Sequence, residues 1–251
     1  MKVLIINGSP RKAGNTDIAL KEMETTFAAE GIETETVQIG NRDIRGCVAC
    51  ETCFQTGKCV FNDIVNDLAP KFEAADGLVI ASPVYYASAN ATLIACLDRL
   101  FFSTHFDKTM KVGASVVVAR RGGCSATFDE LNKYFTMTNM PVVSSQYWNS
   151  VHGREKGEAE KDLEGLRTVR MLARNMSALM RQHTCNFRLG EFLYQLGSHA
   201  DIGVNTSECP GVNLLAFNVE KLRDADPKLF TDRQKEMIDL RHLVLPQPDS
   251  G

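Results

Sequence analysis

The stretch Asn7-Gly-Ser-Pro-Arg-Lys-Ala-Gly-Asn-Thr16 decides how this chain begins to fold. It follows Val3-Leu-Ile-Ile6, an apolar run without polar alternation, which is typical of a central parallel strand covered on both faces. Gly8 and Gly14 allow the backbone to approach a ligand closely, and the start of a helix after them presents free N–H groups. The stretch therefore predicts a strand, a phosphate-holding loop and a helix, with an ordinary capped turn as the plainer alternative.

Side chains in the same loop indicate which kind of phosphate it suits. The loop contains neither Gly-x-Gly-x-x-Gly nor a nucleoside-triphosphate loop ending in Gly-Lys-Ser/Thr. We therefore expect a single terminal phosphate held by hydroxyls and amides, not an NTPase site. The candidate phosphate-binding residues are Ser9, Arg11, Gly14, Asn15 and Thr16.

Strand and helix signals alternate through the first three quarters of the chain. Further strands are predicted at residues 35–39, 77–81, 112–118 and 142–145. Helical spacing of apolar residues lies between them, and a long helix is expected from about residue 163 to 179. This order predicts an α/β fold, a doubly wound, five-stranded parallel sheet that binds ligands beyond the carboxyl ends of its strands.

Composition narrows the class of protein. The 251 residues contain 28 Lys and Arg against 31 Asp and Glu, a net charge of −3, and no run of like charges suits a nucleic acid. No apolar stretch approaches the roughly 20 residues that span a bilayer, and no signal peptide is apparent. We expect a cytoplasmic protein without a nucleic-acid or membrane partner, in which the eight cysteines are reduced, metal-bound or redox-active.

The last quarter of the chain lacks the strand–helix alternation. We expect a domain over residues 1–183 and an irregular, partly helical extension over residues 184–251, with one last helix from Thr231 to about His242. The extension is expected to pack as a strap on its own core or as an arm on a partner subunit.

Two more loops follow predicted strands at the same edge of the sheet. Ser82-Pro-Val-Tyr-Tyr86 offers a rigid turn, two aromatic rings and backbone amides that suit a flat, partly polar ring, although tyrosines there are often packing residues. Arg121-Gly-Gly123 brings the backbone close to a planar group and adds a cation. Three such loops together predict the site of a nucleotide-like cofactor.

These motifs, in this order and together with Leu97-Asp98-Arg99, resemble the NADPH-dependent FMN reductases of the flavodoxin-like superfamily, and among them the iron-sulfur flavoproteins. The resemblance covers residue 1 to about residue 183. It implies non-covalently bound FMN, NADH or NADPH as reductant, and a homodimer or homotetramer. It also implies that Asp98 and Arg99 serve the fold and not the flavin.

Carried over residue by residue, the resemblance divides the FMN contacts between the loops. The phosphate is expected on Ser9, Arg11, Asn15 and Thr16, beside Gly14. The isoalloxazine ring is expected against the other two loops, at Pro83, Val84, Tyr85, Tyr86, Arg121, Gly122 and Gly123.

A cysteine cluster lies between the second and third predicted strands. Cys47, Cys50, Cys53 and Cys59 read Cys-x2-Cys-x2-Cys-x5-Cys, which matches the local wrapping of a 4Fe-4S cluster better than the two separated pairs usual for zinc. The spacing also resembles the compact motif of the iron-sulfur flavoproteins. Zinc and free or redox-active thiols stay open, because Val60 stands where bacterial ferredoxins have proline.

The expected function is that of an FMN-dependent oxidoreductase. It would move electrons from NADH or NADPH to a small-molecule acceptor such as a quinone, a flavin, or a nitro or azo compound, with a possible relay through the cluster. The alternative is a non-enzymatic flavin and iron-sulfur carrier that exchanges electrons with ferredoxin-like partners. A third reading is a flavodoxin-like scaffold that binds zinc and no flavin.

Overall fold

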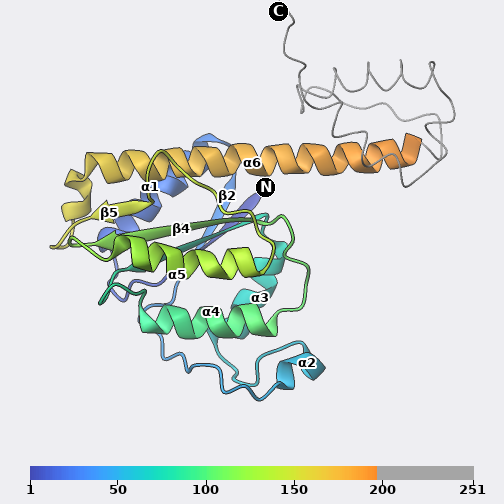
Figure 1. Ribbon diagram of the computed structural model, residues 1–251, viewed down its shortest axis with the longest axis horizontal. Coiled ribbons are helices and arrows are strands. Elements are labelled where there is room, and N and C mark those ends of the chain that lie inside the picture. The colour runs from blue at the N-terminus through green and yellow to red at the C-terminus, as the bar shows by residue number, and fades with distance from the viewer. Residues whose placement is uncertain (197–251) are drawn as a thin grey trace, which may run out of the picture. The chain divides into compact units, whose positions relative to one another are not determined.

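The computed structural model of the chain describes residues 1–196, and their side chains through residue 182. It contains one parallel sheet in the strand order β2-β1-β3-β4-β5 (Figure 1). The strands are β1 (Lys2–Asn7), β2 (Glu33–Gln38), β3 (Gly77–Pro83), β4 (Val112–Ala119) and β5 (Ser150–His152). This order is flavodoxin-like, and its topological switch point between β1 and β3 is where such sheets bind ligands. The predicted α/β, doubly wound, five-stranded fold is confirmed.

Helices cover both faces of the sheet. The two helices on one face are α1 (Asn15–Ala29) and α6 (Leu163–Leu196), and the three on the other are α3 (Ile64–Ala74), α4 (Ala91–Ser103) and α5 (Cys124–Met137). Val3 and Ile5 of β1 pack toward the first pair, whereas Leu4 and Ile6 pack toward the second group. An apolar run without alternation follows directly from this two-sided burial.

The predicted fifth strand is wrong in its position. Val142 forms only an isolated parallel bridge with Gly113 at the start of β4, and the fifth strand is Ser150–His152, beside the end of β4. Between them the Ser145 hydroxyl donates to the Asn149 side chain at 2.7 Å, and Asn149 donates to the Ser115 carbonyl at 3.1 Å. These side-chain bonds fold residues 145–149 into a loop, so the edge strand is interrupted after its apolar start.

The predicted closing helix is present as α6 and is longer than expected. It continues as a helix through the predicted domain boundary at residue 183 to Leu196. The rest of the predicted extension, including the helix expected from Thr231 to about His242, lies outside the described residues.

Two short helical segments complete the described part, α2 (Thr52–Thr56) within the cysteine loop and η1 (Glu158–Lys161) after β5. Within residues 1–196, no helix has both the length and the apolar character that crossing a bilayer requires.

Candidate functional site

The loop after β1 is held from two sides. The side chain of Gln38, at the end of β2, donates to the carbonyls of Ser9 and Arg11 at 2.9 and 3.1 Å. On the other side, Asp17 of α1 accepts the Gly14 N–H at 3.0 Å and the Asn7 amide at 2.5 Å. The loop is therefore fixed before any ligand binds, which lowers the entropic cost of binding.

The start of α1 offers unpaired donors to an anion. The backbone N–H groups of Asn15, Thr16 and Asp17 lie in the first turn and have no intrahelical acceptor. Thr16 as a whole residue is 2% exposed, and its hydroxyl has no hydrogen-bond partner among the residues that the structure describes. Free N–H groups and a free hydroxyl at the positive end of a helix dipole fit a phosphate.

Asn15 has a different role from the one expected of its side chain. The side-chain amide donates to the Glu155 carbonyl at 2.9 Å, and its oxygen accepts the N–H groups of Gly157 and Ala159 at 3.1 and 3.2 Å. Asn15 therefore holds the segment after β5 against the phosphate loop, and its backbone N–H is the group left for an anion. Arg11 is exposed.

Gly40 presses directly against the phosphate loop, a feature that sequence reasoning missed. A Cβ atom on Gly40 would lie 2.0 Å from the Gly8 carbonyl oxygen and 2.4 Å from the Ser9 carbonyl carbon. Gly8 in turn lies against α4, because a Cβ there would come within 2.7 Å of Leu93 Cδ2. The loop thus occupies a narrow space between the end of β2 and α4.

The loop after β3 forms a tight turn whose tip is solvent-exposed. Tyr85 and Ser88 exchange backbone hydrogen bonds at 2.9 and 3.0 Å, and Tyr86 and Ala87 between them have φ of +52° and +60°. Glu130 of α5 accepts bonds from the Ser88 hydroxyl and the Ala89 N–H, which fixes this left-handed conformation. The Tyr86 ring is fully exposed and Tyr85 is partly so, which leaves both rings free to contact a planar ligand.

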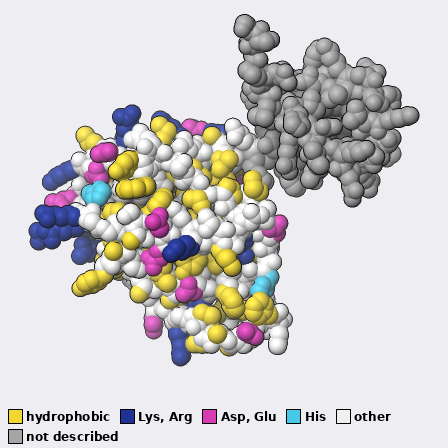
Figure 2. Space-filling view, in the orientation of Figure 1, with side chains coloured by type: hydrophobic (Ala, Val, Ile, Leu, Met, Phe, Trp, Pro, Cys, Tyr) yellow, Lys and Arg dark blue, Asp and Glu magenta, His cyan; other side chains and the backbone are white. Residues whose placement is uncertain are grey.

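The loop after β4 contacts the loop after β3 through Gly123. This glycine has φ +89°, and a Cβ on it would lie 2.9 Å from Ala87 Cα and 3.0 Å from Val84 Cγ1. Val84, which follows Pro83, bonds to the Val118 carbonyl at 2.9 Å, whereas Arg121 and Gly122 are exposed. Lys and Arg side chains gather on the side where β4 and β5 end (Figure 2), which favours an anionic ligand at this edge.

A cluster of three polar side chains, which the sequence did not predict as a group, lies beside this loop. Cys124 Sγ is 3.8 Å from His152 Nε2, and His152 Nδ1 is 3.5 Å from Asp162 Oδ2. Asp162 also accepts the His152 and Gly165 N–H groups at 2.6 and 3.0 Å. Burial raises the pKa of the Cys124 thiol, so the thiol form is favoured. The pairing of β4 with β5 brings the three residues together, and their wide sequence spacing gave no signal.

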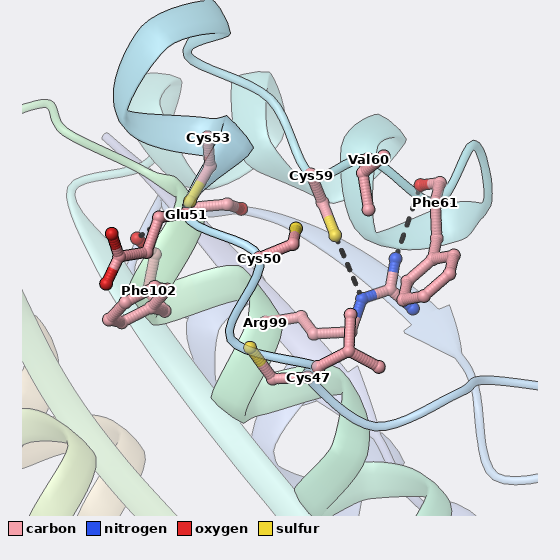
Figure 3. Close-up of a pocket in the computed structure, with 11 residues that line it drawn as sticks. Cys47, Cys50, Glu51, Cys53, Cys59, Val60, Phe61, Arg99 and Phe102 are labelled. Atoms are coloured by element: carbon pink, nitrogen blue, oxygen red, sulfur yellow. Dashed lines mark hydrogen bonds between the residues drawn. The ribbon is translucent and has the colours of Figure 1, made fainter.

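The four predicted metal-ligating cysteines line one pocket on the outer side of α4 (Figure 3). The pocket is small and open to solvent on one side, and Cys47, Cys50, Cys53 and Cys59 all line it. Cys53 is buried and Cys59 half-buried, whereas the other two are exposed. Burial raises the pKa of the Cys53 thiol, and hydrogen bonds from Thr52 lower that of Cys50.

A buried arginine lies beside the fourth cysteine. Arg99 of α4 donates from Nε to Cys59 Sγ at 3.1 Å and forms a two-pronged ion pair with Asp63 at 2.6 and 2.8 Å. Its remaining donors reach the carbonyl of Arg45 at 3.0 Å and that of Phe61 at 3.3 Å. Figure 3 shows the bonds to Cys59 and Phe61. Burial by itself lowers the pKa of Arg99, because it disfavours the charged guanidinium. The hydrogen bonds with Asp63 and Cys59 outweigh this effect and raise the pKa of Arg99 overall, so the side chain stays charged.

The donor set around the pocket fits a cluster with sulfur ligands. No three His, Cys, Asp or Glu side chains in the described part of the chain are arranged as ligands of one ion. The four cysteines instead line one shared pocket, and four thiol side chains are the ligand set that a 4Fe-4S cluster requires. A charged N–H donor aimed at Cys59 suits an anionic thiolate.

The cysteine pocket and the phosphate and ring loops lie at different ends of α4. Asn90, before the first turn of α4, bonds to Ser82 beside the ring loop, whereas Cys53 and Phe54 contact Phe102 at the other end. Asn90 and Phe102 are separated by about 18 Å of helical rise. Figure 1 shows α2 beside this far end of α4.

Comparison with known proteins identifies the family. A model of the NADPH-dependent FMN reductase family matches residues 1–155. The chain belongs to this family. The resemblance to it is thereby confirmed, and the protein is an FMN-binding oxidoreductase with a flavodoxin-like fold.

Curated relatives extend the match. An iron-sulfur flavoprotein of Methanocaldococcus jannaschii is 33% identical over 189 residues, which are 72% of this chain and 98% of that protein. An iron-sulfur flavoprotein of Methanosarcina thermophila is 33% identical over 180 residues, 70% of this chain and 93% of that protein. The resemblance of the chain to the iron-sulfur flavoproteins is thereby confirmed as well.

Solved structures agree on the fold. RosB with a bound riboflavin-phosphate derivative has a TM-score of 0.61 at 18% identity and covers 82% of this chain and 90% of its own. The flavoenzyme FerB of Paracoccus denitrificans has a TM-score of 0.54 at 13% identity, over 72% of this chain and 98% of its own. At these identities the likeness concerns the fold alone.

Proposed function

We propose that this member of the family is an NAD(P)H:acceptor oxidoreductase whose FMN lies across the loops after β1, β3 and β4. The supporting observation is that the first loop packs on β3 and α4, while the third loop packs on the second. Gly8 packs on Leu93 and bonds to the Ala81 carbonyl at 2.8 Å, and Gly123 packs on Ala87. A phosphate site and a surface for a flat ring therefore adjoin at the switch point of the sheet.

Each loop has a separate part in this arrangement. Ser9, Thr16 and the first N–H groups of α1 bind the phosphate, with Gly14 leaving room for it and Arg11 adding charge. Pro83, Val84 and the two tyrosines line the ring, and Arg121 with its glycines faces the ring's polar edge. Bound FMN supplies the chemistry, which is to accept hydride from a nicotinamide and pass the electrons on.

The acceptor is proposed to be a small molecule such as a quinone, a flavin, or a nitro or azo compound. An NADPH azoreductase of Bacillus sp. is 29% identical over 130 residues, which are 50% of this chain and 64% of that protein. That likeness supports trying azo dyes among the acceptors.

We further propose that Cys47, Cys50, Cys53 and Cys59 bind a 4Fe-4S cluster that exchanges electrons with the flavin or with a ferredoxin-like carrier. The shared pocket, the bond from Arg99 to Cys59 and the names of the curated relatives support it. The chain's own contribution is to hold four thiols around one space and to place a cation against one of them.

One sample of protein purified without oxygen tests both proposals. We expect flavin absorbance bands, broad cluster absorbance, and about four irons with matching sulfide per chain. Steady oxidation of NADH or NADPH with a quinone or azo dye would distinguish a reductase from a pure electron carrier. Flavin without iron would contradict the cluster alone, and protein with zinc and no flavin would contradict both proposals.

Replacing Arg121 by alanine is expected to make the midpoint potential of the bound FMN more negative. A cation near the ring stabilises the negative charge of the reduced flavin, so its removal disfavours reduction. Because Arg121 is exposed, the free energy of unfolding should change by less than about 0.5 kcal/mol. A redox titration compares the variant with Arg120→Ala, which removes a neighbouring exposed cation. Equal midpoints in wild type and Arg121→Ala would remove Arg121 from the site.

A further inference from the structure

The Arg99–Asp63 pair beside the cysteine pocket is buried more deeply than a surface ion pair. The Arg99 side chain is 0% exposed and that of Asp63 is 24% exposed. All five N–H donors of the guanidinium are used, two on Asp63, one on Cys59 and two on backbone carbonyls. The guanidinium is therefore a buried cation with all its donors satisfied, and it lines the cysteine pocket.

We propose that Arg99 raises the reduction potential of the cluster and that Asp63 partly offsets it, so that the pair sets the potential. This inference rests on the proposed cluster, and it names the two side chains of this chain that tune the cluster's potential. The pair acts through its charge and its orientation.

The ion pair is oriented with its guanidinium, and not its carboxylate, toward the cysteine ligand. Nε, the one nitrogen that Asp63 does not use, faces Cys59 Sγ, whereas the other two nitrogens face the carboxylate. The guanidinium is thus the member of the pair that contacts the ligand. A reduced cluster carries one more negative charge than the oxidised one, so a nearby cation stabilises the reduced form more. N–H bonds to ligating sulfur act in the same direction.

Arg99 also positions the loop, which is why its test must separate charge from structure. Its bonds to the Arg45 and Phe61 carbonyls join the two ends of the cysteine loop. Asn66 independently holds Cys59, since it accepts the Cys59 N–H and donates to the Cys59 carbonyl, both at 3.0 Å. The backbone of Cys59 therefore keeps two bonds when Arg99 is changed.

The experiment compares the cluster potential in wild type, Arg99→Gln, Asp63→Asn and the double variant, by redox titration monitored by electron paramagnetic resonance. The first variant removes one positive charge, the second removes one negative charge, and the double variant leaves the net charge unchanged. Asparagine keeps an acceptor for the Val65 N–H that Asp63 caps at 3.1 Å, so α3 retains its N-cap. Arg99→Lys is the control that keeps the charge and loses the planar fork.

We expect the midpoint to fall in Arg99→Gln, to rise in Asp63→Asn and to return toward wild type in the double variant. Arg99→Lys should lie nearer to wild type than Arg99→Gln does. Either single change breaks the same ion pair, so a purely structural role would move both midpoints in the same direction. Opposite shifts, with the double variant returning toward wild type, are the result that the two charges predict.

Shifts of the same sign, or unchanged midpoints, in an iron-loaded series would overturn the inference and leave the cluster standing. Wild-type protein without iron would overturn the inference together with the cluster. If Arg99→Gln does not fold, Asp63→Asn decides, because an unchanged or lower midpoint in that variant contradicts the proposal.

Discussion

Replacing Gly40 by alanine is expected to yield protein that is purified with little or no FMN. The new Cβ would lie 2.0 Å from the Gly8 carbonyl oxygen and 2.4 Å from the Ser9 carbonyl carbon. Both neighbours are backbone atoms, so no rotamer change relieves the clash, and the phosphate loop must move. If the displaced loop loses two charge-assisted hydrogen bonds to the FMN phosphate, each of about 1.5–3 kcal/mol, FMN binding would weaken by about a hundredfold or more.

Gly46→Ala is the matched control, because it changes the same residue type in the same connection between β2 and α3. A Cβ on Gly46 meets no atom within 4 Å, so its FMN content should equal that of wild type. FMN per chain is measured after extraction, the dissociation constant by titrating apoprotein, and the fold by circular dichroism. A folded Gly40→Ala protein that binds FMN within about threefold of wild type would show that the phosphate site lies elsewhere.

The role of Gly40 shows what the sequence could and could not predict. Its position one residue after Ile39 is evident in the chain, but a glycine beside a strand has many explanations. That it lies against Gly8 depends on the parallel pairing of β1 with β2, which brings two segments about thirty residues apart together. Apolar runs predicted the central strands because those strands are buried on both faces.

The edge of the sheet was harder to predict, for a related reason. The chain begins to pair with β4 at Val142. The side-chain hydrogen bonds of Ser145 and Asn149 then interrupt this backbone pairing, which resumes around Val151. No hydrophobic pattern records such an interruption. The expected use of Asn15 had the same weakness, since the residue type fits a phosphate and only the tertiary structure shows its amide bonded to residues 155–159.

The cysteine spacing predicted a common set of candidate metal ligands but not the cation beside them. Arg99 was expected, by resemblance, to serve the fold, and it does join Arg45 to Phe61. Its bond to Cys59 depends on how the cysteine loop folds over α4, forty residues farther along the chain. Local motifs thus indicated the candidate binding residues, whereas the groups that position them are distant in sequence.

The double variant Cys47→Ala/Cys59→Ala is expected to lose iron and sulfide almost completely and to keep its FMN. Two thiolates are too few for a 4Fe-4S cubane, so iron should fall from about four per chain to less than about one. FMN should remain because the phosphate and ring loops belong to other segments, at the opposite end of α4 from Phe102. Iron, sulfide and flavin are measured on the same anaerobic sample.

Cys96→Ala is the control for a cysteine on α4 that does not line the pocket. Burial raises the pKa of Cys96 to about 12, so its thiol is protonated near neutral pH and is a poor ligand for iron. Iron should therefore be unchanged in this variant. Iron that persists in the double variant would place the cluster on other ligands, and joint loss of FMN would mean that the cysteine loop and the flavin site are coupled along α4.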